Sequence, residues 1–307
     1  MRIGIDLGGS KIEGVLMDAD SSIRERLRVP TPAGDYVAIV NAIRDLVQAL
    51  EQRAGRRDLK VGIGTPGSVS PATGRMRGCN STCLNGRPLA RDLEAALGRP
   101  VRLANDANCL ALSEARDGAG RGARSVFGVI LGTGVGGGVV IAGQLIAGAN
   151  GIAGEWGHNP LPWPRPGEVP GPRCWCGRQS CLETWLSGPS LSREYLTYAD
   201  ADCTAAEIAQ RLEQGEAAAR AVFARYCERL ARALASVINL LDPEVIVLGG
   251  GLSNIRMLYT DVPALWTAHV FSDRVATRLL PAAHGDSSGV RGAAWLWPGF
   301  GSEPELP

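Results

Sequence analysis

The sequence predicts a mixed α/β protein of two domains, and three observations support this prediction. The chain has 307 residues, which is enough for one large domain or two of ordinary size. Strand-like and helix-like patterns both occur along it. A unit of strand, glycine turn and strand near residue 3 returns after residue 125 as a weak internal repeat, and the glycine-rich segment 118–122 between the two copies is the predicted hinge.

The first half begins with three strands in sequence. Apolar residues alternate over residues 3–7 and stop at Gly8-Gly9, and strands at 14–17 and 23–29 follow across short turns. Such an order favours an antiparallel meander. The other elements predicted here are a helix with 3.6-residue apolar spacing over 36–50, a strand at 61–64, a helix at 89–97, a strand at 101–104 and a helix at 107–115 capped by Asn105-Asp106.

The second half repeats the opening and then becomes helical. A strand at 126–131, a turn at 132–134 and a strand at 139–141 repeat the opening unit. The remaining predicted elements are helices at about 204–214, 216–241 and 287–297, a strand at 245–248 that leads into Gly249-Gly250-Gly251, and a frayed tail from Pro298.

Charge and hydropathy exclude two classes of partner. Lys and Arg number 32 against 31 Asp and Glu, so the net charge of +1 offers no basic surface for nucleic acid. The uncharged stretch 125–154 is long enough to span a bilayer, but its many glycines would make a poor helix. The first residues lack the apolar core of a signal peptide. We therefore expect a cytoplasmic protein without a membrane partner.

Glycine is the compositional outlier, with 40 residues, about twice its average share of roughly 7%. Phosphate is bound by backbone N–H groups that converge on it, and side chains would block that approach. The segment Asp6-Leu7-Gly8-Gly9-Ser10-Lys11 offers such a turn and an acid for a metal-bound water. A tight hairpin without a ligand explains this turn equally well. The chain contains no Walker A pattern, which excludes a P-loop NTPase.

A second glycine segment raises an alternative. Gly132-Thr133-Gly134-Val135-Gly136-Gly137 matches G-x-G-x-x-G after a strand, as in dinucleotide-binding folds. That fingerprint requires a helix next, with the pyrophosphate at its N-terminus. The residues that follow are β-branched and reach another glycine at Gly143. The pattern therefore predicts a hairpin and not a Rossmann unit.

Three of the eight cysteines lie close together in the sequence. With one of only three histidines they form H-x15-C-x-C-x4-C, made by His158, Cys174, Cys176 and Cys181. A Cys₃His set is typical of tetrahedral structural zinc with no open coordination position. Unrelated cysteines beside a core histidine are the plain alternative, and a disulfide is disfavoured in a chain without a secretion signal. We predict a structural zinc site.

Three carboxylates are candidates for chemistry. Asp106 stands between a predicted strand and a predicted helix, where by position alone it would be a helix N-cap. Glu155 precedes His158, and Glu183 follows the third clustered cysteine. Each glutamate by itself could be a solvated surface acid. Beside a metal site their backbone would be fixed, which favours a functional role.

Taken together, these motifs resemble the ROK family (repressors, open reading frames, kinases) of sugar kinases, and within it bacterial fructokinases of the manno(fructo)kinase type. The resemblance covers residues 2–297. It rests on the segments 6–11, 80–86, 103–109, 153–158, 174–183 and 248–251. Two positions depart from the family pattern: Ser10 replaces a common threonine, and Ser180 stands where a glycine usually precedes the third cysteine.

The resemblance implies an α/β fold of two domains, like that of actin and the hexokinases (ribonuclease H-like), with a cleft between them. Residues 1–117 with 286–307 would form the smaller N-terminal domain, closed by the C-terminal helix. Residues 118–285 would form the larger domain with the zinc loop. The resemblance further implies ATP and Mg²⁺ as cofactors, a small hexose as substrate, and a homodimer.

The resemblance also assigns roles to residues. Asp106 would be the general base for the attacking sugar hydroxyl. The other sugar contacts would come from Asn80, Asn105, Glu155, His158 and Glu183, with His158 also a zinc ligand. Phosphates and the metal would lie near Asp6, Gly8, Gly9, Ser10, Lys11, Gly132, Thr133 and Gly134, and adenosine near Gly249, Gly250 and Gly251.

We therefore predict an ATP-dependent hexose kinase, a fructokinase acting on the 6-hydroxyl of D-fructose and also on mannose. An N-acetylglucosamine kinase or a glucokinase of the same family is the alternative, because loop geometry decides which hydroxyl or N-acetyl group fits. A sugar-sensing regulator is a remote alternative. The family's repressors carry an N-terminal helix-turn-helix, whereas the first strand here starts at residue 2 and the charge is balanced.

Overall fold

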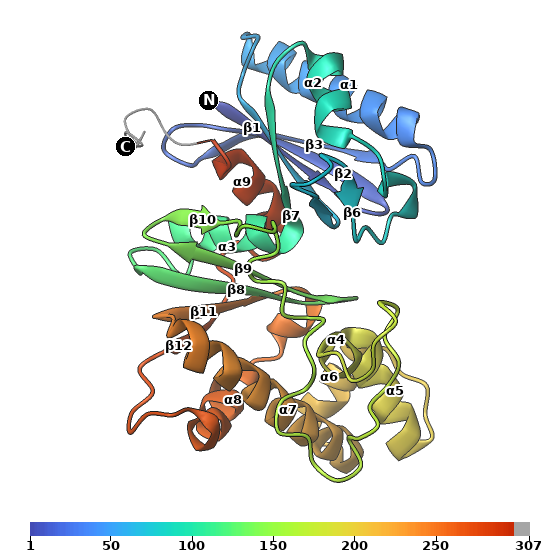
Figure 1. Cartoon of the computed structure of the whole chain (residues 1–307), viewed down its shortest axis with the longest axis vertical. Helices are drawn as coiled ribbons and strands as arrows, with labels where there is room; N and C mark the ends of the chain where they lie inside the picture. The colour runs from blue at the N-terminus through green and yellow to red at the C-terminus, as the bar shows by residue number, and fades with distance from the viewer. Residues whose placement is uncertain (298–307) are drawn as a thin grey trace.

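Two five-stranded sheets stacked with a helical layer between them make up the fold (Figure 1). The structure is a computed structural model and describes residues 1–297; the tail predicted from Pro298 lies outside these residues. The strand order is β3-β2-β1-β4-β7 in the first sheet and β10-β9-β8-β11-β12 in the second. The layers from top to bottom of Figure 1 are α1 and α2, the first sheet, α9 and α3, the second sheet, and the remaining helices.

The first sheet confirms the predicted meander. Its strands are β1 (Arg2–Leu7), β2 (Lys11–Met17), β3 (Ile23–Pro30), β4 (Val61–Thr65) and β7 (Val101–Asn105). The first three pair antiparallel, and β1, β4 and β7 pair parallel. Helices α1 (Tyr36–Ala54) and α2 (Leu89–Leu97) cover one face, and a small hairpin, β5 (Ser68–Val69) with β6 (Met76–Arg77), lies between them in sequence. The apolar stripe of α1 packs on this sheet in one buried cluster, as its spacing predicts.

The second sheet shows that G-x-G-x-x-G here is a hairpin. Its strands are β8 (Ser125–Leu131), β9 (Val135–Ile141), β10 (Gln144–Ile146), β11 (Val245–Gly249) and β12 (Arg278–Pro281). Strands β8 and β9 pair antiparallel from end to end. No helix follows the glycines, so the rejection of a Rossmann unit is confirmed. Both β9 and β11 pair with β8, which therefore lies at the centre.

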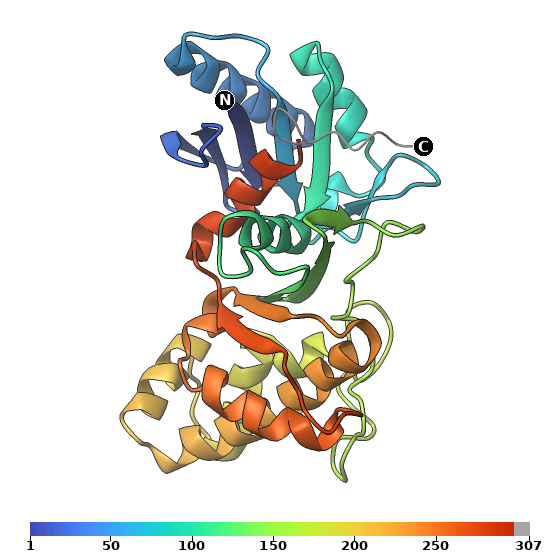
Figure 2. The ribbon, with the colours of Figure 1, turned by 90° about the vertical axis from the view of Figure 1, so that its left-hand side faces the viewer.

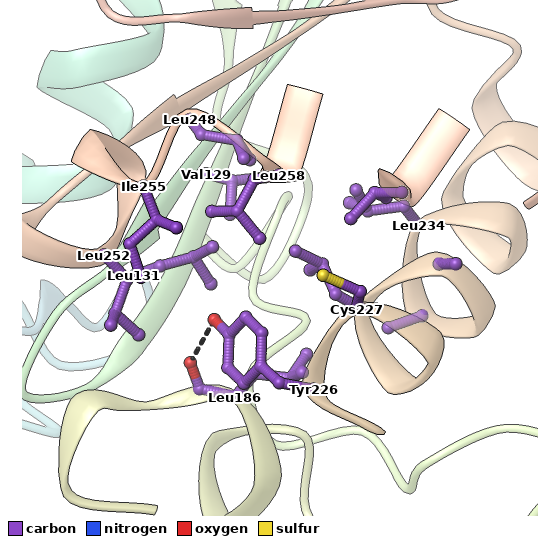
Figure 3. Packing of buried hydrophobic residues seen from close by; sticks show 14 of the residues in the cluster. Val129, Leu131, Leu186, Tyr226, Cys227, Leu234, Leu248, Leu252, Ile255 and Leu258 are labelled. Carbon is purple, nitrogen blue, oxygen red and sulfur yellow. Dashed lines mark hydrogen bonds between the residues drawn. The ribbon is translucent and has the colours of Figure 1, made fainter. Parts of the chain in front are cut away.

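Helices below the second sheet bury the larger core. They are α4 (Glu183–Leu186), α5 (Gly188–Ala199), α6 (Ala205–Glu213), α7 (Ala217–Leu241) and α8 (Leu258–Trp266). In Figure 3, Leu258 of α8 lies beside Val129 and Leu248 of the sheet, and residues of α7 belong to the same buried cluster. The Tyr226 hydroxyl of α7 donates to the carbonyl of Leu186 at 2.9 Å. Among the helices of residues 1–297, none is both long and apolar enough to cross a bilayer.

Two helices, α3 (Asp106–Arg116) and α9 (Ser288–Trp295), fill the layer between the sheets (Figure 2). Helix α3 packs on β8, β9 and α9, and α9 packs on β1 and β4. The fully buried carboxylate of Glu114 accepts hydrogen bonds from the Ala119 and Ala283 amides at 2.8 and 2.9 Å, and from the Ser288 hydroxyl at 2.8 Å. One side chain thus fixes the predicted hinge segment and the entry to α9. The domain boundaries at 117/118 and 285/286 stay a prediction.

Candidate active site

Polar residues gather where the parallel strands of the first sheet end. Asp6 of β1 pairs with Gly64 of β4, and Thr65 of β4 pairs with Asn105 of β7. Because the carboxyl ends of parallel strands share one edge, residues distant in sequence meet there. Asp106 follows directly as the first residue of α3. This edge is therefore the candidate active site.

The helix cap next to the site is Asn105 and not Asp106. The Asn105 side-chain oxygen accepts from the Asn108 amide at 2.7 Å, and its Nδ2 donates to Glu155 Oε1 at 3.1 Å. Asp106 accepts only from the neighbouring Ala107 amide, at 2.8 Å, among the described residues. Asn105 therefore caps the helix and holds Glu155, while one carboxylate oxygen of Asp106 is free for another partner.

Glycines of β9 position these residues by allowing close packing. A β carbon on Gly138 would lie 2.8 Å from the Ala107 carbonyl oxygen, and one on Gly137 would lie 2.7 Å from the Gly154 carbonyl oxygen. Alternate strand residues face opposite sides, so α3 contacts one face of β9 and the loop that carries Glu155 contacts the other. The sequence of this run predicted a hairpin, with phosphate contacts at 132–134, and gave no signal for the close packing at Gly137 and Gly138.

The environment of Asp106 suits a general base. Its side chain is open to solvent. So much protein surrounds it, however, that lost hydration raises the pKa of its carboxyl, and the charge of Glu155 raises it further. The hydrogen bond from Ala107 opposes this shift without cancelling it. A carboxylate with a raised pKa accepts a proton more readily than an ordinary one.

Asp6 is the second carboxyl at this edge. Burial, together with the charges of Asp106 and Glu13, raises its pKa from 3.8 to about 6, although Lys11 opposes the shift. A raised pKa in the folded state means that the folded protein binds this proton more tightly than the unfolded chain. The contribution to stability is therefore present below pH 3.8 and is lost as the pH rises through about 6.

We expect Asp6→Asn to stabilise the protein at neutral and alkaline pH. At pH 8 the free energy of unfolding should exceed that of the wild type by up to about 3 kcal/mol, because the buried charge is gone, and the difference should vanish near pH 4. Urea unfolding at several pH values measures this. Asp45→Asn, at an exposed position of α1, is the control and should show no such pH trend. An equal difference at pH 4 and pH 8 would contradict the prediction.

The first glycine turn is a tight hairpin at the same edge. The Gly8 amide donates to the Lys11 carbonyl at 3.0 Å, and Gly9 and Ser10 form the exposed tip. Thr31 holds the turn, because its hydroxyl donates to the Gly8 carbonyl at 2.8 Å. A β carbon on Gly9 would lie 3.9 Å from the Ser81 hydroxyl, so the exposed residue Asn80 belongs to a segment beside this turn.

A separate pocket of about 840 Å³ joins two of the predicted glycine segments. Gly132 and Thr133 of the β8–β9 turn line it with Gly251, together with residues of α5 and α6. Gly249 does not line it: a β carbon there would lie 2.1 Å from Leu110, so this glycine permits packing against α3. Glycine segments that are far apart in the sequence therefore meet at one pocket, as a nucleotide site requires.

The predicted zinc ligands also meet. The four ligand atoms of His158, Cys174, Cys176 and Cys181 lie within 4.8 Å of one another. The Sγ atoms of Cys176 and Cys181 are 3.6 Å apart, and Cys174 Sγ is 3.5 Å from His158 Nδ1. Thiolates in a tetrahedral zinc site are about 3.8 Å apart, so the donor set and its spacing fit the metal. Ser180 has a φ of 60°, which explains why glycine is usual there, and the four ligands still gather.

Glu183 contacts two segments, and neither contact was predicted from the sequence. Its Oε2 accepts from the Val135 amide at 3.0 Å, and its Oε1 accepts from the Trp175 indole at 2.7 Å. It thereby joins the cysteine loop to the start of β9. Trp175 was missed in the sequence analysis, because an aromatic residue between two cysteines gives no signal of a contact with a glutamate eight residues away.

The two stacked sheets with polar strand ends and a glycine-lined pocket define an actin-like ATPase fold, as predicted. The chain belongs to the ROK family, whose model matches residues 2–299. It is 41% identical over 300 residues to an N-acetyl-D-glucosamine kinase of Salmonella typhimurium (96% of this chain, 99% of the relative).

Two solved structures of the family are similar over most of their length. A ROK hexokinase from Thermus thermophilus superposes with a TM-score of 0.84 at 32% identity (95% of this chain, 96% of that chain). A ROK family glucokinase from Streptomyces griseus in complex with glucose and AMPPNP superposes with a TM-score of 0.80 at 30% identity (96% and 98%). The chain is therefore a sugar kinase of this family, as the resemblance implied.

The predicted sugar is wrong. Relatives with 41% identity over 96% of the chain are N-acetyl-D-glucosamine kinases, so fructokinase is not supported. The prediction of fructose depended on resemblance in residues 80–86 alone. Motifs at a kinase site are shared among sugars, whereas discrimination depends on the shape of the surrounding loops.

Proposed function

We propose that this protein is an ATP-dependent N-acetyl-D-glucosamine kinase. The observation that carries the proposal is the arrangement of Asp106, Asn105 and Glu155 at one sheet edge, in a chain that is 41% identical to kinases for this sugar. Hydroxyl groups both donate and accept, and a cluster of one amide and two carboxylates matches them at fixed geometry.

Asp106 performs the proton transfer in this proposal. The sugar hydroxyl donates its proton to the free oxygen of Asp106 while its oxygen attacks the γ-phosphorus of ATP, and the bond from that phosphorus to the bridging oxygen breaks to release ADP. General-base assistance of this kind contributes typically 10²–10⁴-fold. Asn105 and Glu155 orient the sugar, and Asn80 and His158 stay candidates for further contacts.

ATP fits the pocket that Gly132, Thr133 and Gly251 line, with its phosphates toward the backbone of the glycine turns. Asp6 would hold Mg²⁺, which prefers carboxylate oxygen and water ligands. Bound Mg²⁺ neutralises charge on the phosphates. The raised pKa of Asp6 supports this role, because a nearby cation would compensate the unfavourable charge of the buried carboxylate.

Zinc is the third proposed cofactor, with a structural role. His158, Cys174, Cys176 and Cys181 would hold it, and four protein ligands leave no open position for chemistry. Zinc there supplies a fixed geometry to the loop. The Gly157 carbonyl in that loop accepts from the Glu183 amide at 2.9 Å, so an ordered loop keeps Glu155, His158 and Glu183 in place.

Steady-state kinetics on four hexoses test the proposed function. With ATP and Mg²⁺, we expect the full chain to give its highest kcat/KM with N-acetyl-D-glucosamine, ahead of glucose, mannose and fructose. Discrimination at a site that binds a polar substituent can reach 10⁴-fold, so a preference should be plain. Higher kcat/KM with glucose would replace the proposal with a glucokinase, and no sugar-dependent ADP would end it.

A further inference from the structure

The exposed aromatic residue Trp175 connects the cysteine loop with the carboxylate of Glu183, which lies at the second glycine turn (132–134). Trp175 lies between Cys174 and Cys176, and 69% of its surface is exposed. Its ring packs edge-on against His158, with centroids 5.0 Å apart and planes at 84°. Nothing in the sequence pattern requires a large aromatic residue at this position.

The indole of Trp175 is fixed by a charge-assisted hydrogen bond. Its Nε1 donates to Glu183 Oε1 at 2.7 Å, and the other oxygen of Glu183 accepts from the Val135 amide at 3.0 Å. Within residues 1–297, each carboxylate oxygen of Glu183 accepts from one N–H donor, so both oxygens of the side chain are held. Hydrogen bonds to ionised groups are shorter and stronger than neutral ones, so this orientation is well defined.

A carboxylate held in this way can still bind a sugar. An ionised carboxylate offers about four lone-pair positions, and the two N–H donors use two of them. The other two stay available for hydroxyl groups. A β carbon on Gly134 would lie 2.7 Å from Glu183 Oε2, so the carboxylate also lies directly against the second glycine turn.

We propose that Trp175 is a positioning residue of the sugar site, acting through Glu183. The inference rests on the proposed function, because it takes Glu183 as a sugar contact. The indole holds Glu183 Oε1 in the orientation that a sugar hydroxyl needs. The side chain is therefore already ordered when the sugar arrives, and sugar binding costs less conformational entropy. Trp175 touches neither reacting atom in this proposal, and the rate of phosphoryl transfer does not depend on it.

The test measures the affinity for N-acetyl-D-glucosamine by calorimetry without nucleotide, beside kcat and the KM for ATP. Trp175→Phe keeps the ring and removes the donor. We expect the sugar Kd to rise about tenfold, with kcat and the KM for ATP nearly unchanged and the bound zinc retained. Trp163→Phe is the matched control. Trp163 is another exposed tryptophan of the same loop, and its ring stacks on His269, with centroids 5.3 Å apart, instead of contacting Glu183.

A double-mutant cycle separates this role from general loop disruption. Glu183→Gln alone should weaken sugar binding more than Trp175→Phe, and the double variant should bind the sugar as Glu183→Gln does, because the indole acts through that carboxylate. Additive losses, an unchanged Kd in Trp175→Phe, or loss of zinc in that variant would each overturn the inference. If the wild type bound the sugar but transferred no phosphoryl group, the proposed function would be refuted. The inference about Trp175 could still be tested, because the double-mutant cycle measures sugar binding and not turnover.

Discussion

Replacing Asp106 with asparagine should lower kcat about 10²–10⁴-fold and leave the KM for the sugar nearly unchanged. The amide oxygen of asparagine can still accept the hydrogen bond that the Ala107 amide donates at 2.8 Å, so the start of α3 is preserved. The amide cannot take the proton of the attacking hydroxyl. The loss therefore falls on the chemical step, and an ADP-release assay over a range of sugar concentrations measures it.

The matched control is Asp35→Asn. Asp35 also accepts a backbone hydrogen bond at a helix start, from the Ala38 amide at 3.0 Å, but it caps α1 on the outside of the first sheet. That variant should keep the wild-type kcat. If Asp106→Asn kept it as well, proton transfer to this residue would be ruled out, and the assignment of the sheet edge as the active site would lose its main support.

Loss of the metal cluster should produce the second large effect. Cys176→Ala removes one of the four proposed ligands. We expect the purified wild type to carry one zinc per chain and the purified variant to carry none. At free zinc concentrations 100 to 1,000 times the Kd, binding to the folded state alone stabilises a protein by about 3–4 kcal/mol, and this stabilisation should be lost. The kcat/KM for the sugar should fall on the order of 100-fold, because the loop that carries the proposed sugar contacts Glu155 and Glu183 is no longer held.

Cys203→Ala provides the comparison. Cys203 is a buried cysteine of the core below the second sheet and lies outside the cluster. The Cys203→Ala variant should bind zinc as the wild type does and lose only the stability that comes from packing of the Cys203 side chain. Metal analysis, urea unfolding with and without a chelator, and sugar kinetics are the measurements. A chelator that left the stability of the wild type unchanged would show that the four side chains do not hold a structural metal.

Several parts of the fold could be predicted because the signal is local. Neighbouring residues alone produce the alternation in β1, the short turns before β2 and β3, and the apolar stripe of α1. The structure confirmed the predicted meander and helix. Helix α8 was missed because Pro263 lies inside it, and proline normally marks a helix boundary. Its apolar residues pack in the core below the second sheet, and tertiary packing outweighed the local signal.

The sequence predicted which residues form the candidate site, but it did not predict which of them contact one another. The spacing of the Cys₃His set predicted four residues that would share a metal, and their side chains meet in the structure. Two contacts could not be predicted from the sequence: Asn105 caps the helix and leaves Asp106 free, and Trp175 donates to Glu183. Each depends on which segments are adjacent in space. The sugar was predicted wrongly for the same reason, since loop shape is a property of the assembled chain.

The order of local patterns along this chain determined its class: paired α/β halves, glycine turns, a Cys₃His set and an aspartate between a strand and a helix. Only the tertiary structure decided which of these act together. Parallel pairing of β1, β4 and β7 placed Asp6, Asn105 and Asp106 at one edge of the first sheet. Gly137 and Gly138 let α3 and the Glu155 loop approach β9 from opposite faces. Such contacts join residues that are remote in sequence, and pairing and packing of the whole chain are what bring them together.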